Sequence, residues 1–124
     1  MQKKILMSGA LLGALAVGIG AFGAHGLKPL LTEYGRLDTF ETGVKYHFYH
    51  SLALILIGLL QFHIKSKKLE WAGILMIAGI FIFSGSLYVL CLTNIGILGA
   101  ITPIGGVGFI VGWLMLLFAV SKEL

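Results

Sequence analysis

Four long apolar runs, each without a charged side chain, constrain this sequence more than any other feature. A helix needs about 20 apolar residues to cross a bilayer, because hydrocarbon offers no partner to unpaired backbone groups. The four runs meet that requirement and predict an all-α, polytopic membrane protein with four transmembrane helices. We expect the crossings at about residues 5–24, 46–64, 71–92 and 103–120, with an outer interfacial segment at 25–45.

The composition disfavours a water-soluble protein. Of the 124 residues, 58% are hydrophobic and 11% are charged, whereas a soluble domain has about 25% charged residues. The five acidic and nine basic side chains are too few to cover a surface facing water. A soluble enzyme, a nucleic-acid-binding protein and a disordered chain are therefore disfavoured. We expect one membrane domain over residues 1–124, with the lipid bilayer as its main partner.

The distribution of positive charge predicts the orientation. With four crossings, both termini and the 65–70 connection share one side of the membrane, and loops rich in lysine and arginine remain in the cytoplasm. We therefore expect a multi-pass protein of the inner or plasma membrane with both termini cytoplasmic. Six of the nine basic residues lie on the side of the termini: Lys3, Lys4, Lys65, Lys67, Lys68 and Lys122.

The first run could instead be a signal peptide, since Ala21-Phe22-Gly23 resembles a cleavage site. Its apolar stretch is longer than the 7 to 15 residues usual in such peptides. An uncleaved first crossing is the preferred interpretation.

The 25–45 segment has the pattern of a short amphipathic helix. Apolar residues recur at steps of three and four between positions 27 and 44, which is the spacing of one helical face. Pro29 suits a first helical position, and Gly35 is expected to interrupt the helix. We predict a short helix on the outer membrane surface that serves as an anchor.

Two further helix starts carry sequence signals. Asp38 followed by Glu41 resembles a capping pair and predicts that the second membrane helix begins near Thr39. Thr102-Pro103 has the pattern of an N-cap followed by the first helical residue of the fourth helix. The glycine-rich stretch before it leaves open an earlier, kinked start near Ile95.

Small residues form seams on three of the runs. Lipid tails are as apolar as leucine, so membrane helices associate through close backbone approach, which small residues permit. The seams predict a tightly packed bundle, and they are equally suited to contacts with a second copy or with another membrane protein. The seam residues are Gly9, Gly13, Ala16, Gly20 and Gly23 on the first run, Ala72, Gly79 and Ser86 on the third, and Gly108 and Gly112 on the fourth.

Polar residues gather in the outer half of all four crossings. His47 and His50 lie on one face of the second helix, and a histidine facing lipid would be costly, so both are expected to face the bundle interior. The candidate ligand-binding cluster consists of His25, Glu41, His47, His50, Ser84, Ser86, Tyr88 and Thr102.

Several roles for this cluster are open. Amphipathic rings are common at the headgroup level, and buried ones hydrogen-bond neighbouring helices, which makes a structural role the preferred one. The alternatives are a pocket for a lipid or another small molecule, a proton relay, a metal site using His25, His47 and His50, and a haem held by two histidines. The His-x-x-His spacing is a weak motif, so we predict no metal and no cofactor.

The function predicted from the residues is modest. The sequence has no nucleophile elbow, phosphate loop or paired carboxylates, and we expect no catalytic residue and no enzymatic activity. Cys91 is single and lies in an apolar run, as a buried hydrophobe would. The leading hypothesis is a structural, accessory or self-associating membrane protein. The alternative is a binding or transport module that uses the polar cluster, and transport would require an oligomer because four helices enclose little room.

Specific motifs extend over nearly the whole chain: residues 20–28 (GAFGAHGLK), 40–47 (FETGVKYH) with His50, 83–88 (FSGSLY), 98–106 (LGAITPIGG), and Gly112-Trp113. Together they resemble the domain of unknown function 423 family of small bacterial inner-membrane proteins, which is similar to the eukaryotic transmembrane protein 256. The resemblance implies a four-helix membrane protein. It implies no activity and no catalytic residues.

Overall fold

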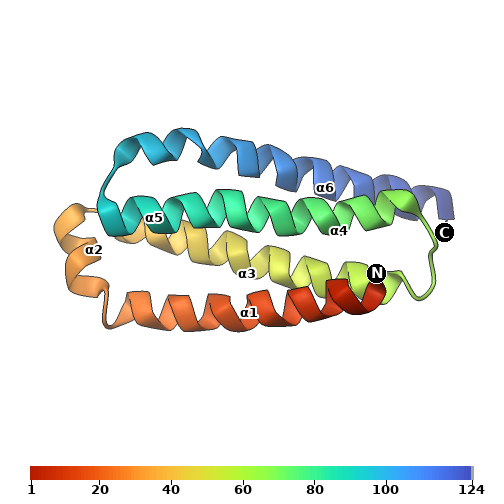
Figure 1. Cartoon of the computed structure of the whole chain (residues 1–124), viewed down its shortest axis with the longest axis horizontal. Helices are drawn as coiled ribbons and strands as arrows, with labels where there is room; N and C mark the ends of the chain where they lie inside the picture. Colours follow the sequence, from red (N-terminus) through yellow and green to blue (C-terminus); the bar gives the residue numbers. More distant parts are fainter. Residues whose placement is uncertain (124) are drawn as a thin grey trace.

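The structure, a computed structural model, describes residues 1–123 and is a bundle of long helices (Figure 1). Four helical spans are long and apolar enough to cross a membrane: Gln2–Ala24, Leu37–Leu60, Lys67–Thr93 and Gly96–Glu123. No strand occurs among the described residues. The prediction of an all-α protein with four transmembrane helices is confirmed.

The first two spans are single helices, whereas the last two change helix type. They are α1 (Gln2–Ala24) and α3 (Leu37–Leu60), with the short α2 (Lys28–Tyr34) between them. The third span consists of α4 (Lys67–Gly79), the π-helix η1 (Ile80–Ser84) and α5 (Gly85–Thr93), and the fourth of the 3₁₀ helix η2 (Gly96–Ala100) and α6 (Thr102–Glu123).

Both termini lie at the same end of the bundle (Figure 1). We call this end, which also holds residues 61–66, the lysine end. The opposite end, which holds α2 and η2, is called the loop end. An even number of antiparallel spans places the two ends of a chain together, so this arrangement follows from the four spans.

The start of α3 differs from the prediction. Its N-cap is Arg36 and no side chain caps it, so the predicted capping pair of Asp38 and Glu41 is wrong. The reason is the sharp end of α2: Gly35 is left-handed (φ 67°), and the Arg36 N–H returns to the Leu31 carbonyl at 2.9 Å. The chain reverses at once, and α3 begins before Asp38 is reached.

The fourth α-helix begins at Thr102, one residue before the predicted Pro103. The alternative of an earlier, kinked start near Ile95 is also met in part, since the fourth helical span extends from Gly96 to Glu123. Its first residues are not α-helical, and they follow a left-handed Asn94 (φ 57°) and an extended Ile95 (ψ 95°). The intervening stretch is η2, whose tighter turn suits a short connection. The π-helix in the third span has no counterpart among the predictions.

The spans pack in the spatial order α1, α3, the third span and α6 (Figure 1). α1 lies along α3, α6 lies along α4, and α3 also contacts α4 and α5. One buried apolar cluster extends through all four spans, with Ile5, Leu54, Met76 and Phe109 among its members. A second cluster at the loop end contains Leu31 of α2, Phe40, Leu90 and Cys91, and it attaches α2 to the bundle.

The small residues of α1 lie against α3 of the same chain. A Cβ on Gly9 would come within 3.0 Å of Leu54 Cβ and of the Ser51 carbonyl, and one on Gly20 within 3.1 Å of Val44. A Cβ on Gly23 would overlap the Phe40 ring. Ala16 is 1% exposed, and Gly13 lies beside Ser51. The seam of α1 therefore makes contacts within the chain.

The small residues of the third and fourth spans also face each other. A Cβ on Gly112 would lie 3.3 Å from the Met76 side chain. A Cβ on Gly108 would lie 3.9 Å from the Cα of Gly79. Gly105 lies against backbone, since a Cβ there would overlap the backbone of Phe83 in the π-helix. This close approach joins α6 to the third span where η1 interrupts it.

Candidate functional site

The eight candidate residues do not form one enclosed site. Six of them make hydrogen bonds at contacts between helices, and two are exposed at the loop end. The contacts fall into three groups: His50 between α3 and α6, His47 and Tyr88 between α3 and α5, and the serines with Thr102. All three groups join one helix of the bundle to another.

His50 is buried and both of its ring nitrogens are used. The Trp113 indole N–H donates to Nε2 at 3.0 Å, and Nδ1 contacts the Tyr46 backbone carbonyl at 2.6 Å. An indole N–H only donates and a carbonyl only accepts, so the proton of a neutral ring lies on Nδ1. Nε2 then has no lone pair left for a metal.

Aromatic rings surround His50. Phe109 stacks on its imidazole with the ring centroids 3.5 Å apart and the planes at 12°. Trp113 meets it edge-on at 65°, and Tyr46 stacks against Phe83 at a centroid distance of 4.9 Å. These rings fill the space between α3 and α6, so His50 acts here as a packed, neutral aromatic side chain.

His47 joins α3 to α5. Its Nδ1 lies 2.8 Å from the Tyr88 hydroxyl, and the ring is 3% exposed. Nε2 turns toward the Leu12 backbone of α1 but lies outside hydrogen-bond geometry, so this buried nitrogen has no partner. A phenol that donates to Nδ1 leaves the ring proton on Nε2, where it faces α1.

The hydroxyl groups also connect helices. Ser84 Oγ, in the π-helix, donates to the Gly43 carbonyl of α3 at 2.7 Å. Ser86 Oγ lies 2.6 Å from Thr102 Oγ1 and joins α5 to the start of α6. A second hydrogen bond runs from Ser86 to the Phe83 carbonyl at 2.9 Å. These bonds satisfy groups that would be costly in hydrocarbon.

His25 and Glu41 are exposed near the loop end and stand apart from the buried histidines. His25 follows the last residue of α1, and Glu41 is on the first turns of α3, beside a shallow groove. Within residues 1–123, no three histidine, cysteine or carboxylate groups come together as a metal site requires. The candidate ligand set His25, His47 and His50 is therefore not assembled.

The aromatic partners of His50 were missed from the sequence. Phe109 and Trp113 stand four residues apart and thus on one face of α6, a spacing that could have drawn attention to them. The spacing alone does not reveal which helix that face contacts. Only the packing of α6 shows that His50 is the partner.

An apolar groove of about 390 Å³ runs along α1 at the loop end. Ala14, Gly18 and Phe22 of α1 line it, together with Phe40 of α3 and Leu92 of α5. Tyr88 also lines it, so the His47–Tyr88 pair lies at its margin. Gly18 has open space where a Cβ would be.

Comparisons with known proteins match the chain to a family of unknown function and to relatives named as membrane proteins. A family model described as "Protein of unknown function (DUF423)" matches residues 19–106. The chain is 50% identical over 121 residues to "UPF0382 membrane protein SAB0533" of Staphylococcus aureus (strain bovine RF122 / ET3-1), covering 98% of each chain. It is 48% identical over 124 residues to "UPF0382 membrane protein YwdK" of Bacillus subtilis (strain 168), covering 99% of this chain and 100% of that one. No solved structure matches.

These matches confirm the resemblance noted in the sequence. All the motifs between residues 20 and 106 lie within the matched stretch, and Gly112-Trp113 lies beyond it. The relatives are named as membrane proteins, in agreement with the four apolar spans.

Proposed function

Because the chain belongs to the DUF423 family, whose members have no assigned function, we propose a role from its own geometry: a non-enzymatic accessory protein that self-associates within the membrane. Its preformed bundle presents a helix surface to a second copy. No chemical reaction is part of this role.

One observation carries the non-enzymatic part of the proposal. His50, the deepest titratable group of the predicted cluster, has both ring nitrogens engaged by Trp113 and Tyr46. A general base or a metal ligand needs a free lone pair, and this imidazole has none. The hydroxyls of Ser84 and Ser86 are likewise used between helices. These polar groups serve to hold the bundle together.

The surface for self-association is the outer face of α1. The seam from Gly9 to Gly23 is occupied by α3, but Ala14 and Gly18 face outward from the same helix. They stand four residues apart, and both line the 390 Å³ groove. Small residues at this spacing allow the helix of a second copy to approach closely, which is how membrane helices associate.

A bulky substitution in the groove tests this role. Ala14→Leu should block close approach and shift the protein to monomers, as measured by native mass spectrometry or by single-molecule photobleaching in lipid bilayers. Ala78→Leu is the matched control, because Ala78 is exposed on the third span away from the groove. A wild-type protein that is monomeric in bilayers, or equal effects of both substitutions, would reject self-association through α1.

Binding of a lipid or another small molecule in the same groove is the second candidate. It is favoured by the Tyr88 phenol, the one hydrogen-bonding side chain among the lining residues of an otherwise apolar groove. In this case Tyr88→Phe should reduce the amount of co-purified lipid-like ligand without changing the oligomeric state. Loss of the oligomer with unchanged ligand would support the first candidate instead.

We also propose that the protein lies in the cell membrane with both termini cytoplasmic. Six lysines gather at the lysine end, which the positive-inside rule places in the cytoplasm. In a Cys91→Ala background, a membrane-impermeant maleimide applied to intact cells without a cell wall should label Thr32→Cys and spare Ser66→Cys. The reverse pattern would invert the orientation.

A further inference from the structure

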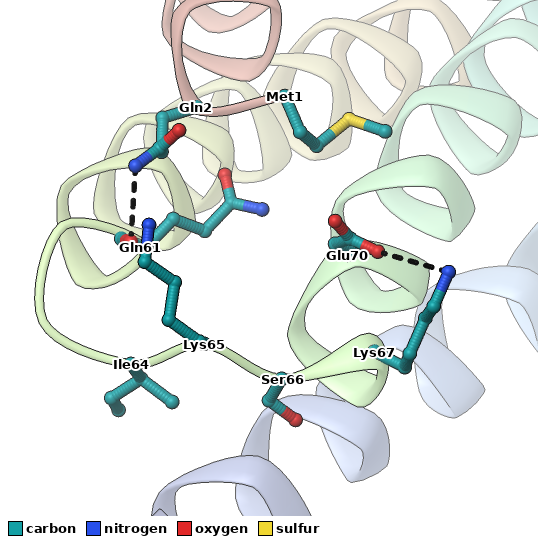
Figure 2. A pocket seen from close by; sticks show the side chains of 8 residues that line it. All are labelled: Met1, Gln2, Gln61, Ile64, Lys65, Ser66, Lys67 and Glu70. Carbon is teal, nitrogen blue, oxygen red and sulfur yellow. Dashed lines mark hydrogen bonds and ion pairs between the residues drawn. The ribbon is translucent and has the colours of Figure 1, made fainter.

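A polar pocket lies at the lysine end, away from the candidate cluster of His25, His47 and His50 and from the groove on α1. It has a volume of about 260 Å³ and is formed where α3 ends and α4 begins, with the first residues of α1 above it (Figure 2). It is lined by Met1, Gln2, Gln61, Ile64, Lys65, Ser66, Lys67 and Glu70. Neither self-association nor the groove on α1 uses this pocket, so a ligand bound here would give the protein a role beyond the proposed function.

Gln61 is the first sign of a ligand here. Its side chain extends from the end of α3 into the space between Met1 and Glu70 (Figure 2). Gln61 is 5% exposed, and its Oε1 is buried with no hydrogen-bond partner. The Gln2 amide reaches only the Gln61 backbone carbonyl, at 3.2 Å. A buried polar atom without a partner costs about 1–3 kcal/mol, so a ligand that donates a hydrogen bond would be favoured.

The start of α4 is the second sign. Ser66 is the N-cap and has extended backbone (φ −144°, ψ 132°), yet its hydroxyl makes no capping hydrogen bond. The first N–H groups of a helix have no partner within the helix, and together with the helix dipole they favour an anion. α4 has 13 residues, long enough for that dipole to develop.

The charges at the pocket complete the description. Lys65 has no acidic partner among the described residues, whereas Lys67 lies 3.8 Å from Glu70. The side chains of Lys65, Lys67 and Glu70 together give the lining side chains one net positive charge. The pocket thus contains donors for an anion, and two acceptors for a donor, Gln61 Oε1 and the Glu70 carboxylate.

We propose that this pocket binds the phosphoglycerol headgroup of an anionic phospholipid from the leaflet at the lysine end. The phosphate accepts hydrogen bonds from Lys65, the Ser66 hydroxyl and the free N–H groups of α4, and the glycerol hydroxyls donate to Gln61 Oε1 and Glu70. The net positive charge favours this headgroup over a zwitterionic one. The surrounding lysines, which include Lys3, Lys4 and Lys68, enrich anionic lipids near the same surface.

Headgroup competition on the wild-type protein is the main experiment. The full chain in a neutral detergent is titrated with phosphatidylglycerol, phosphatidylmethanol, phosphatidylethanolamine and phosphatidylcholine, and bound lipid is counted by native mass spectrometry. Phosphatidylmethanol carries the same charge as phosphatidylglycerol but has no hydroxyl. Phosphatidylglycerol should bind at least about fivefold more tightly than phosphatidylmethanol, which corresponds to one hydrogen bond of about 1 kcal/mol.

Glycerol 3-phosphate separates the two sources of this chemistry. Added at millimolar concentration, it should displace little phosphatidylglycerol, because it lacks the acyl chains that hold a lipid against the bundle. Displacement at equal concentration would identify the ligand as a free phosphate ester and would overturn the lipid assignment.

Two substitutions and a matched control test the pocket itself. Lys65→Gln should weaken phosphatidylglycerol about fivefold, and Lys68→Gln should not, because Lys68 lies over the Phe118 ring (6.0 Å) and does not line the pocket. Gln61→Leu should abolish the preference for phosphatidylglycerol over phosphatidylmethanol without altering the charge. Thermal unfolding of each variant shows whether its fold is retained.

Besides displacement by glycerol 3-phosphate, three results would overturn the proposal. Equal binding of phosphatidylglycerol and phosphatidylmethanol by the wild-type protein removes the role of the hydroxyls, whatever the variants do. Equal losses of phosphatidylglycerol affinity in Lys65→Gln and Lys68→Gln would show that the lipid is attracted by the positive charge of the whole surface and not by the pocket. Tighter binding of phosphatidylethanolamine than of phosphatidylglycerol would show that the group donating to Gln61 Oε1 and Glu70 is an ammonium group and not a hydroxyl. None of these results bears on the oligomeric state, so the proposal fails or stands separately from the proposed function.

Discussion

Trp113 donates its indole N–H to Nε2 of His50 across the space between α6 and α3, at 3.0 Å. The two residues are 63 positions apart in the sequence, and the bond determines which tautomer the buried imidazole adopts. His50, which the sequence offered as a candidate metal ligand or proton carrier, therefore serves as a contact between helices.

Removing this bond should destabilise the protein. Trp113→Phe keeps most of the ring but leaves His50 Nε2 buried without a donor, which costs about 1–3 kcal/mol. The free energy of unfolding in detergent measures the loss. Trp71→Phe is the control, since Trp71 is 52% exposed and makes no side-chain hydrogen bond among the described residues. Equal stability of the two variants would show that the bond contributes nothing.

The contact between α6 and the π-helix should tolerate no side chain. Gly105→Ala places a methyl group against the Phe83 backbone, which cannot move aside cheaply, and should cost about 1–3 kcal/mol. At the neighbouring Gly106 a Cβ would lie 3.8 Å from the Phe83 ring, an ordinary contact. Gly106→Ala should therefore be neutral or stabilise the helix by up to about 1 kcal/mol. Thermal unfolding of the two variants gives the difference in their stability. If Gly105→Ala were as stable as Gly106→Ala, the close approach of Gly105 to the Phe83 backbone would be contradicted.

The His47–Tyr88 pair should show coupling in a double-mutant cycle. Tyr88→Phe leaves both imidazole nitrogens without partners and should cost about 1–2 kcal/mol. His47→Leu removes the unpaired nitrogens altogether, so the double variant should be more stable than the sum of the two single changes predicts. Strict additivity would mean that the two side chains do not interact. Tyr49→Phe, at an exposed tyrosine, is the control.

Cys91 should resist thiol reagents in the folded protein. Its side chain is fully buried (0% exposed), and its Sγ lies 3.7 Å from the Arg36 carbonyl, which it contacts as a weak donor. A small maleimide should label it only after the loop end opens, whereas Thr93→Cys in a Cys91→Ala background should react at once because Thr93 is exposed. The labelling rate of Cys91 relative to that of the control gives the free energy of this opening. Equal rates would place Cys91 at the surface.

The seams show what the spacing of small residues can predict about helix packing. Small residues at steps of three and four on the first run indicated a face that a neighbouring helix approaches closely. The pattern could not say whether that helix belongs to the same chain. In the structure α3 fills the seam, and Gly18, which lies outside it, has open space instead. The surface that we propose for self-association is therefore a different face of α1, the one that carries Gly18.

The candidate site shows which part of its geometry the sequence could predict and which part it could not. Depth along each span could be estimated from the sequence, and it brought His50, Ser86 and Thr102 to the same half of the membrane. The sequence also predicted that His47 and His50 face the bundle interior, and both are buried. It could not predict which neighbouring helix each side chain would meet. Ser86 meets Thr102, but His50 faces α6 and His47 faces α5.

The sequence by itself determined the four membrane spans, their antiparallel arrangement and the gathering of lysines at one end, because these follow from the length and polarity of continuous segments. Tertiary structure alone decided the partners: Trp113 with His50, α3 in the seam of α1, the π-helix beside Gly105, and the unpaired Gln61 at the lysine end. The physical reason is that hydrocarbon requires every helix to satisfy its own backbone but leaves side chains free to pair across helices. Which pairs form depends on the rotation and separation of the helices, and those are set by the packing of the whole bundle.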